Sequence, residues 1–294
     1  MRVGITGGSG FLGKEISRVL KEQGHTPIII GRRASFDTEH EYCQTDYSVE
    51  SLDKVLFGFD ALIHLASIRG AEGNISDFHN NEIITENIFK SCVNSRLNNI
   101  VYASTIAVYS DSNNIPWSEK HIPSPKTLYG VSKLACEHIG EIYHRRYGLN
   151  IKSLRIAQVL GEGERKGFMM NTFIDNAFKR KSLNVIGKSV AKREFVYIKD
   201  VAKAMLLAIL KPEIHGTFNI GSNTAYTNLE IANIINKCFS NKGNITYNEL
   251  EDEKMESSLM SSLKAYKVLG YSAEYSLEQA LIEIRNQKLE VRSV

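Results

Sequence analysis

A glycine-rich stretch close to the start of the chain places glycines at positions 7, 10 and 13. It follows a short apolar run, Val3–Thr6, and precedes an amphipathic helical pattern over Phe11–Gln23. With this spacing, Gly7 permits a tight turn, Gly10 lets a pyrophosphate approach the backbone, and Gly13 lets the helix pack closely on the strand. The free N–H groups and the dipole of the helix then favour an anion at this end. The stretch therefore predicts a dinucleotide-binding loop.

Strand and helix patterns alternate through the first half of the chain. Apolar strand candidates lie at Thr26–Ile30, Ala61–Leu65, Ile100–Ser104 and Ile151–Ile156, and the longest helical patterns cover Phe78–Ser95 and Thr127–Arg146. Connections between parallel strands are right-handed, so this order predicts an α/β fold with a doubly wound parallel sheet and helices on both faces.

The regular alternation ends after residue 160, which divides the chain into two parts. We expect residues 1–160 to form the dinucleotide-binding domain and residues 194–221 to return to it. We expect residues 161–193 and 222–294 to form a smaller substrate lobe on the carboxyl edge of the sheet, where open α/β sheets bind ligands.

The composition argues against several classes of partner. The 294 residues include 36 Lys+Arg and 33 Asp+Glu, and a net charge of +3 does not predict a nucleic-acid or membrane partner. The four cysteines are far apart and the eight histidines show no paired metal-ligand spacing, so we expect free thiols and no metal site. With no signal-peptide pattern in the first residues, these features favour a cytoplasmic protein.

The residues after the second strand bear on the kind of dinucleotide. NAD-binding units place an acidic residue about twenty residues beyond the glycines, where it binds the ribose 2′-hydroxyl. Here Arg32 and Arg33 stand at that position, and no acid occurs before Asp37. A guanidinium can bind a 2′-phosphate through two hydrogen bonds, so the sequence favours NADP(H) over NAD. Asp46 is a candidate contact for the adenine edge.

Tyr129 and Lys133 lie four residues apart in the second long helical pattern, so both side chains project from one helix face. A phenol has an ordinary pKa of about 10 and is a poor base at neutral pH. A neighbouring ammonium group stabilises the phenolate and brings it into the working range. Thr105, at the end of a strand, could hydrogen-bond the reacting substrate oxygen. The three residues predict proton transfer at a substrate hydroxyl.

Together these motifs resemble the extended short-chain dehydrogenases/reductases of the nucleotide-sugar epimerase/dehydratase type. Similar stretches elsewhere are His64-Leu65-Ala66, Asn81, Ser104-Thr105, Leu154-Arg155, Arg193–Val201 and Gly216–Gly221. They follow the family's order over nearly the whole chain, and they imply a Rossmann-type fold with a nicotinamide cofactor, NAD(P). The expected cofactor contacts are Gly7, Gly10, Phe11, Leu12, Gly13, Arg32, Arg33, Asp46, Tyr47, Leu65, Ala66, Ser67, Asn81, Ser104, Tyr129 and Lys133.

The resemblance also implies a reaction on a nucleotide sugar. Tyr129 would remove a hydroxyl proton while C4 of a hexose gives hydride to the nicotinamide. Lys133 would hold the ribose hydroxyls and Thr105 would hydrogen-bond the oxygen at C4. Gln158 and Arg193 would contact the substrate, Arg193 at the diphosphate. Family members usually pair their two long helices with those of a second copy, so we expect a homodimer.

Two departures from the family pattern narrow the activity. Relatives that eliminate water carry Asp-Glu directly after the catalytic Thr, whereas this chain has Ile106-Ala107, which cannot transfer protons. A 4,6-dehydratase is therefore disfavoured. A second arginine for the diphosphate is missing, since no arginine lies between Arg193 and Arg285. The identity of the nucleotide sugar stays open.

Three functions fit these residues. The first is a 4-epimerase for a UDP-hexose or UDP-N-acetylhexosamine, and the overall pattern favours it. The second is an NADPH-dependent 4-ketoreductase, which Arg32 and Arg33 favour because an NADP(H) user usually exchanges its cofactor in each cycle. The third is a catalytically silent dinucleotide sensor, which the complete Thr105, Tyr129 and Lys133 set disfavours.

Overall fold

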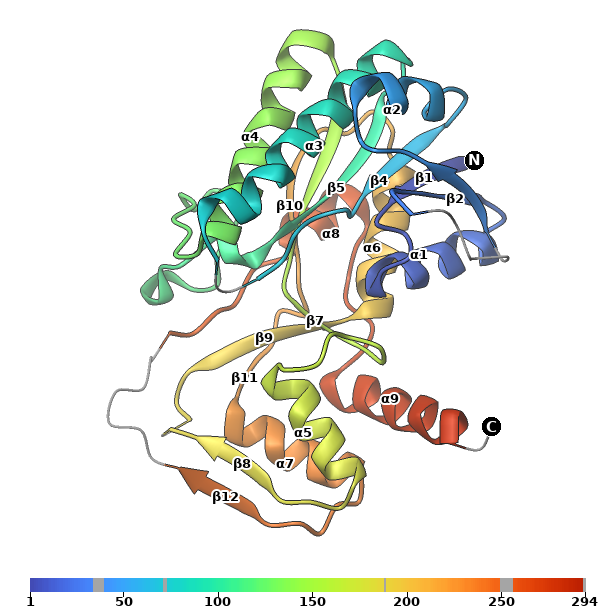
Figure 1. Ribbon diagram of the computed structural model, residues 1–294. Helices are drawn as coiled ribbons and strands as arrows, with labels where there is room; N and C mark the ends of the chain where they lie inside the picture. Colours follow the sequence, from blue (N-terminus) through green and yellow to red (C-terminus); the bar gives the residue numbers. More distant parts are fainter. Residues whose placement is uncertain (34–39, 71–72, 188, 249–255, 293–294) are drawn as a thin grey trace.

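The computed structural model describes residues 1–33, 40–70, 73–187, 189–248 and 256–292, and Asp37 lies outside these ranges (Figure 1). Seven parallel strands form the main sheet in the order β10-β6-β5-β4-β1-β2-β3. They are β1 (Arg2–Thr6), β2 (Thr26–Gly31), β3 (Glu41–Gln44), β4 (Ala61–His64), β5 (Asn99–Thr105), β6 (Asn150–Ile156) and β10 (Gly216–Ile220). The order reverses beside β1, as expected for a doubly wound sheet, and the predicted α/β fold is confirmed.

Helices cover both faces of this sheet because its central strands are apolar on both sides (Figure 1). Ile29 of β2 joins the core beneath α1 (Phe11–Glu22) and α6 (Ile198–Ile209). Its neighbours Ile28 and Ile30 point to the opposite core, beneath the other helices. Those helices are α2 (Val49–Val55), α3 (Ile75–Asn94) and α4 (Leu128–Tyr147). Within the described ranges, no helix combines the length and apolarity needed to cross a membrane.

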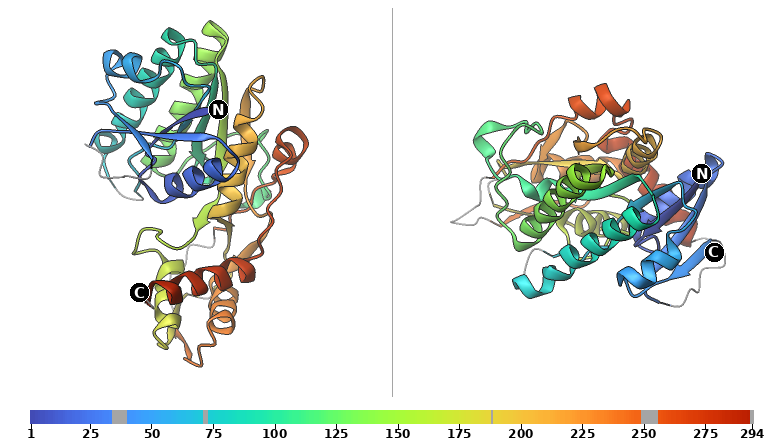
Figure 2. Two further views of the ribbon diagram at one scale, coloured as in Figure 1. Left: turned by 90° about the vertical axis from the view of Figure 1, so that its right-hand side faces the viewer. Right: turned by 90° about the horizontal axis from the view of Figure 1, so that it is seen from above.

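A smaller lobe lies below the carboxyl edge of the main sheet (Figure 2, left). It contains a three-stranded sheet in the order β11-β9-β7 and a two-stranded sheet of β12 and β8. The strands are β7 (Gln158–Leu160), β8 (Leu183–Ile186), β9 (Lys192–Tyr197), β11 (Ala225–Thr227) and β12 (Ile245–Asn248). With α5 (Met169–Phe178), α7 (Asn228–Cys238) and α9 (Leu277–Arg292), they enclose a separate apolar core.

The chain crosses between the lobes several times. Two segments do not lie in the part of the molecule to which the sequence analysis assigned them. β9 was expected to return to the main sheet, but it pairs with β7 and β11 in the small lobe. α8 (Leu263–Leu269) was expected in the substrate lobe, but its apolar residues Ala265 and Leu269 join the core beside α6. α6 and β10 lie in the main domain.

Candidate active site

The glycine loop joins β1 to α1 and leaves no room for a side chain at Gly7 or Gly13. Gly7 has a φ of 70°, and a Cβ there would lie 2.9 Å from the Ala66 nitrogen. A Cβ on Gly13 would lie 2.5 Å from Gly8 Cα, so α1 can approach the loop only with glycine at this position. A Cβ on Gly10 would meet the Gly7 oxygen alone within 4 Å, at 3.2 Å. This cradle, open beside the α1 N-terminus, fits a dinucleotide pyrophosphate.

The loop after β4 lies beside the glycine loop. The Thr6 hydroxyl accepts hydrogen bonds from the nitrogens of Leu65 and Ala66, both at 3.2 Å, and bonds His64 Nδ1 at 2.7 Å. The other ring nitrogen of His64 lies 3.0 Å from the Thr85 hydroxyl. These bonds bring Leu65 and Ala66 next to Gly7, as expected for residues that share one ligand.

Arg32 and Arg33 are exposed where β2 ends. Their carbonyl oxygens accept hydrogen bonds from Gln44 Nε2, at 3.1 Å, and from the Tyr42 hydroxyl. These backbone contacts fix the turn and leave the guanidinium groups on the surface. Both arginines are thus exposed at the end of β2, and their contact with the adenosine ribose stays a prediction.

Asp46 and Tyr47 both make hydrogen bonds within the protein. Asp46 Oδ1 accepts bonds from the nitrogen and hydroxyl of Ser48, at 2.8 and 2.7 Å, and these bonds lower the pKa of Asp46. Tyr47 is buried, and its hydroxyl lies 3.3 Å from the Ile30 oxygen. Burial raises the pKa of Tyr47 to about 12. Asp46 thus shapes the entry to α2, and its adenine contact stays a prediction.

The start of α4 carries the predicted catalytic pair. The Thr127 hydroxyl caps the helix by accepting the Gly130 N–H at 3.0 Å. Gly130 packs against the Ala107 carbonyl of η1 (Ile106–Val108), where a side chain would not fit. This contact holds the first turn of α4 against the end of β5. As a result, Thr105 lies close enough to the Tyr129 phenol to lower its pKa.

Opposing influences act on the Tyr129 phenol. Burial raises its pKa above the ordinary value and outweighs the positive charge of Arg69 and the Thr105 side chain, which lower it. The Phe78 ring of α3 lies with its centroid 6.2 Å from that of Tyr129. Arg69, in the loop after β4, was not predicted from the sequence as a site residue. Neither its position in the chain nor a motif marks it.

Lys133 lies one turn further along α4 and is 2% exposed. Its Nζ stands 4.3 Å from the centroid of the Tyr102 ring, in a cation–π contact. Burial lowers the pKa of Lys133 to about 8. The role of Lys133 in stabilising the Tyr129 phenolate stays a prediction, and Arg69 is a second cation that lowers the pKa of this phenol.

A buried polar network lies under the catalytic pair. Glu137, four residues after Lys133, pairs with Arg155 of β6, with Nη2 and Oε2 2.6 Å apart. The Ser104 hydroxyl donates to the same carboxylate, and Arg155 Nη1 donates to the Tyr109 hydroxyl at 2.6 Å. Ser104 is buried in this network, which ties β5, α4 and β6 together, and its expected contact with the cofactor stays a prediction. The spacing Tyr129, Lys133, Glu137 on one helix face could have revealed Glu137.

Asn81 of α3 is also occupied by protein contacts. Its Oδ1 accepts the Ile68 N–H at 2.7 Å, and its Nδ2 donates to the Ile68 oxygen at 3.1 Å and to the Ser132 hydroxyl at 3.2 Å. Ser67 donates to the Ile68 oxygen at 3.3 Å. Asn81 and Ser67, both predicted as cofactor contacts, therefore shape the loop after β4 here.

The predicted substrate residues share one face of the small three-stranded sheet. Gln158 is the first residue of β7 and pairs with Phe195 of β9, and Arg193 lies two residues before Phe195. Gln158 also follows Ile156 closely, and Ile156 pairs with Thr105 in the main sheet. The chain thus leaves the main sheet beside Thr105 and carries Gln158 onto the face that bears Arg193.

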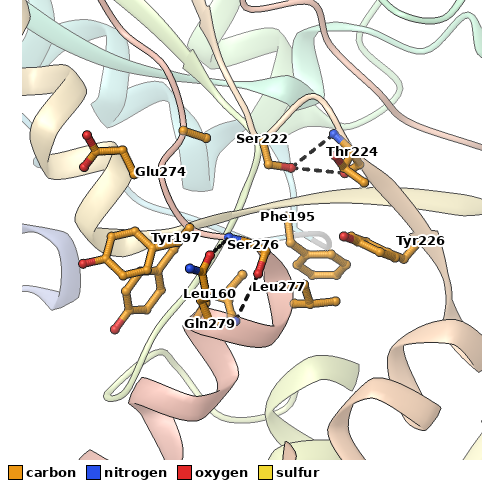
Figure 3. A pocket seen from close by; sticks show the side chains of 13 residues that line it. Leu160, Phe195, Tyr197, Ser222, Thr224, Tyr226, Glu274, Ser276, Leu277 and Gln279 are labelled. Carbon is orange, nitrogen blue, oxygen red and sulfur yellow. Dashed lines mark hydrogen bonds between the residues drawn. The ribbon is translucent and has the colours of Figure 1, made fainter.

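A cavity of about 300 Å³ lies elsewhere in the small lobe, between β9, β11 and the start of α9 (Figure 3). Tyr197, Tyr226 and Phe195 form part of its wall. Its polar groups bond one another, since the Ser276 hydroxyl accepts the Gln279 N–H at 3.2 Å and Gln279 Oε1 accepts the Ser276 N–H at 2.9 Å. None of the predicted catalytic residues lines it. The candidate active site is the carboxyl edge of the main sheet.

The doubly wound fold and the glycine cradle at the carboxyl edge of its sheet are those of a dinucleotide-binding enzyme. Comparison with known proteins identifies the family. Residues 3–221 match the NAD dependent epimerase/dehydratase family, and the chain belongs to it. The resemblance stated from the sequence is confirmed.

Several proteins similar to this chain are named as UDP-sugar 4-epimerases. The chain is 45% identical to UDP-N-acetylglucosamine 4-epimerase from Bacillus cereus, with a TM-score of 0.93 over 100% of this chain and 97% of that one. It is 30% identical over 298 residues to a putative UDP-glucose 4-epimerase from Methanocaldococcus jannaschii, covering 96% of each. The NAD complex of UDP-glucose 4-epimerase from Thermus thermophilus has the same fold, with 23% identity, a TM-score of 0.84 and coverage of 97% and 98%.

Proposed function

We propose that the protein is a nucleotide-sugar 4-epimerase that acts on a UDP-hexose or UDP-N-acetylhexosamine. The observation that carries the proposal is that Thr105, the last residue of β5, and Tyr129, in the first turn of α4, meet at the carboxyl edge of the sheet, where Gly130 packs against the Ala107 carbonyl. Strand β4 alone separates β5, which ends at Thr105, from β1, which leads into the glycine cradle. The names of the relatives from Bacillus cereus and Methanocaldococcus jannaschii support the same activity.

Each residue of this site has a separate role in the proposed reaction. A nicotinamide dinucleotide, when bound at the glycine cradle, supplies an acceptor for hydride from C4 of the sugar. Tyr129 takes the proton of the C4 hydroxyl and later returns it. Thr105 hydrogen-bonds the C4 oxygen and orients it toward the phenol. Lys133 adds positive charge near the reacting groups, and Gln158 and Arg193 hold the substrate from the small lobe.

Elimination of water does not fit the site. Ile106 and Ala107 follow Thr105 in η1, and neither side chain can donate or accept a proton. Ile106 packs against the apolar core beneath α1 and α6. A 4,6-dehydratase would need an acid and a base at these two positions, so the site is suited to C4 chemistry alone.

The preference between the two dinucleotides rests on Arg32 and Arg33. The family description names NAD, and the Thermus thermophilus relative was solved with NAD. Two exposed guanidinium groups at the end of β2 favour NADP(H), because they can pair with a 2′-phosphate. This same observation favours the second candidate function, an NADPH-dependent 4-ketoreductase.

The epimerase and the ketoreductase are separated by one experiment. A 4-epimerase interconverts UDP-hexose epimers with no added nicotinamide, because the hydride returns to the sugar. A 4-ketoreductase consumes one NADPH for each 4-keto sugar reduced, which absorbance at 340 nm detects. Stoichiometric loss of NADPH without epimerisation would replace the first proposal by the second.

We also infer a homodimer formed through α3 and α4. Leu128, Val131 and Ile142 are 39%, 40% and 40% exposed and lie on one face of α4 at helical spacing. Ile83 of α3 is 44% exposed and adds to this apolar surface. Two copies of the α3–α4 pair would bury these side chains in a four-helix bundle.

A further inference from the structure

The ammonium group of Lys133 is buried against an aromatic ring. Lys133 is 2% exposed and Tyr102 is 1% exposed. Lys133 Nζ lies 4.3 Å from the centroid of the Tyr102 ring, well within the range of a cation–π contact. Among the residues that the structure describes, none forms a hydrogen bond or an ion pair with this Nζ atom. The negative face of the ring thus meets a charge that has no paired anion in the described part of the chain.

The carboxylate one turn further along α4 is directed elsewhere. Glu137 pairs with Arg155, with Nη2 and Oε2 2.6 Å apart, and accepts a hydrogen bond from the Ser104 hydroxyl. Tyr102 and Ser104 are alternate residues of β5, so their side chains leave the strand on the same face, toward α4. The strand therefore offers a hydroxyl to Glu137 and a ring to Lys133.

The Tyr102 ring is held in place from the neighbouring strand. The His64 ring of β4 lies with its centroid 5.5 Å from that of Tyr102. Both ring nitrogens of His64 have partners, the hydroxyls of Thr6 at 2.7 Å and of Thr85 at 3.0 Å. Burial lowers the pKa of His64 to about 3, and the charge of Lys133 lowers it too. His64 is therefore neutral at physiological pH and adds no positive charge beside Lys133.

An aromatic ring stabilises a cation in a different way from a carboxylate. A carboxylate in contact with Lys133 would accept the hydrogen bonds of the ammonium group. The face of a ring stabilises the charge through its quadrupole and leaves N–H donors for the hydroxyl groups of a ligand. Free donors of this kind are what a lysine needs if it is to hold the ribose hydroxyls of a dinucleotide, the role that the family resemblance implies for Lys133.

The remaining charged or titratable groups that act on Lys133 come from α4 and from the loop after β4. Burial lowers the pKa of Lys133, Cys136 and Glu137 raise it, and Arg69 lowers it further. The Tyr102 hydroxyl is buried and forms no hydrogen bond with a described residue. The part of Tyr102 that contacts Lys133 is therefore the face of its ring.

We propose that Tyr102 is a positioning residue of the reaction, whose ring holds the Lys133 ammonium in place by a cation–π contact and leaves its N–H donors to the dinucleotide. The proposal rests on the proposed function, in which Lys133 serves the reacting groups. It gives a residue in the middle of β5, outside the Thr105, Tyr129 and Lys133 set, a part in the chemistry.

The test compares Tyr102→Phe, Tyr102→Leu and Phe89→Leu with the wild type, each as the purified protein with its bound cofactor. Phe keeps the face of the ring, and Leu removes it. Phe89 of α3 is the matched control, because it is 0% exposed and belongs to the same apolar core as Tyr102, but its ring packs against Tyr143. The readouts are kcat and KM for C4 epimerisation of UDP-N-acetylglucosamine and UDP-glucose, with urea denaturation to measure stability.

Tyr102→Phe keeps kcat within about twofold, because the cation–π contact remains. Tyr102→Leu lowers kcat about tenfold with little change in KM for the sugar, because the contact is lost while the small lobe is intact. Phe89→Leu loses stability as Tyr102→Leu does, but it keeps kcat. Equal kcat in Tyr102→Leu and Phe89→Leu would overturn the proposal, as would an equal fall in Tyr102→Phe and Tyr102→Leu.

A graded series decides the matter if Tyr102→Leu does not fold. Phenylalanines with one, two or three fluorine atoms on the ring, placed at position 102, fit the same space but carry progressively less negative charge on the ring face. If the cation–π contact serves the reaction, kcat falls with each added fluorine atom. A kcat that does not depend on the number of fluorine atoms would refute the contribution of the ring face.

A second readout does not need turnover. NMR of protein labelled with carbon-13 at the lysine Cε atoms follows the titration of Lys133, whose signal is identified by its loss in Lys133→Met. Tyr102→Leu moves this titration down by about one pH unit, because the ring favours the charged form, and Phe89→Leu leaves it in place. An unmoved titration in Tyr102→Leu would contradict the proposal. If the wild type fails to epimerise either sugar, the proposed function fails while this titration still decides the role of Tyr102.

Discussion

Tyr129 and Lys133 lie one helical turn apart, yet their surroundings are different. Tyr129 meets a hydroxyl and a guanidinium, which favour the phenolate, while its burial opposes it. Lys133 lies over the Tyr102 ring, and burial brings its pKa to about 8. Burial prevails at Tyr129, whose pKa stays above its ordinary value, so burial moves the pKa values of the two groups in opposite directions.

Replacing Tyr129 by Phe removes the hydroxyl that we assign as the proton acceptor. We expect kcat for epimerisation to fall by about 10²–10⁴, with little change in stability. Tyr143→Phe, on the same helix but packed between Phe89 and Tyr147, is the matched control and should keep wild-type turnover. Normal turnover in Tyr129→Phe would refute the catalytic assignment.

Lys133 belongs to the candidate active site, and its burial destabilises the folded protein at neutral pH. Its pKa falls from 10.5 to about 8 on folding, so the unfolded chain binds the proton more tightly. Below pH 8 this difference destabilises the fold by roughly 3 kcal/mol, and the penalty fades as pH rises from 8 to 10.5. We expect Lys133→Met to raise the free energy of unfolding by about 1–3 kcal/mol at pH 7 and less at pH 9.5, and to abolish turnover. Urea denaturation at both pH values measures this, and lower stability at pH 7 would contradict it.

We expect the preference between the two dinucleotides to depend on single residues. Arg32→Asp replaces a cation that can pair with a 2′-phosphate by an anion that repels it and accepts a bond from a 2′-hydroxyl. We expect the ratio of Kd for NADP(H) to Kd for NAD(H) to rise at least about tenfold, as measured by calorimetry. Lys54→Asp on α2 makes the same charge change elsewhere. An unchanged ratio in Arg32→Asp would remove the basis for an NADP(H) preference.

The residue contacts that join distant segments could not be predicted from the sequence. Arg69 and Glu164, which form an ion pair, are 95 positions apart, and neither belongs to a motif. Tyr129 and Lys133 could be predicted because both lie on one helix at a spacing that fixes their relative direction. Ser104 and Asn81 stand in motif positions, but their partners Glu137 and Ile68 come from other elements, so their contacts here were not foreseen.

At the scale of elements, the glycine loop and α1 form one unit. Gly13→Ala would push a methyl group into Gly8 and the Gly7 carbonyl, so α1 would have to move away from the loop. We expect a loss of about 1–3 kcal/mol in stability together with loss of bound dinucleotide, measured by denaturation and by the cofactor content of the purified protein. Gly24 follows the end of the same helix and has a φ of 74° with no close neighbour. Gly24→Ala should therefore lower stability by about 1–2 kcal/mol and keep the cofactor. Equal cofactor content in both variants would contradict this role of Gly13.

The long elements of the main domain could be predicted closely, and the short strands of the small lobe could not. The helix predicted over Thr127–Arg146 runs from Leu128 to Tyr147, because Thr127 caps its start and Gly148, with a φ of 73°, ends it. β7 and β11 contain three residues each and exist through pairing with β9, which is distant in the sequence. Such strands have too few residues to show a hydrophobic period.

At the scale of the molecule, the connections between the lobes replace a single boundary. Glu194 of β9 is buried and accepts the N–H groups of Met260 and Asn223, both at 2.8 Å. Burial raises the pKa of Glu194 to about 7. One carboxylate thus holds two segments, near residues 223 and 260, that lie far apart in the sequence.

The inferred homodimer depends on the apolar face of α4. Val131→Glu and Ile142→Glu place charges where two helix pairs would meet, so we expect a shift from dimer to monomer in sedimentation experiments. Ile122→Glu is the control, since Ile122 is 89% exposed and lies outside the helices. A wild type that sediments as a monomer, or variants that stay dimeric, would contradict this interface.

The central claim is that hydride leaves C4 of a nucleotide sugar and returns to it. The most direct measurement is NMR of UDP-N-acetylglucosamine and UDP-glucose incubated in D₂O with the purified protein and no added nicotinamide. The account predicts a mixture of C4 epimers in which C4 carries protium, because hydride does not exchange with solvent. Deuterium at C4, or no epimer of either sugar, would contradict it.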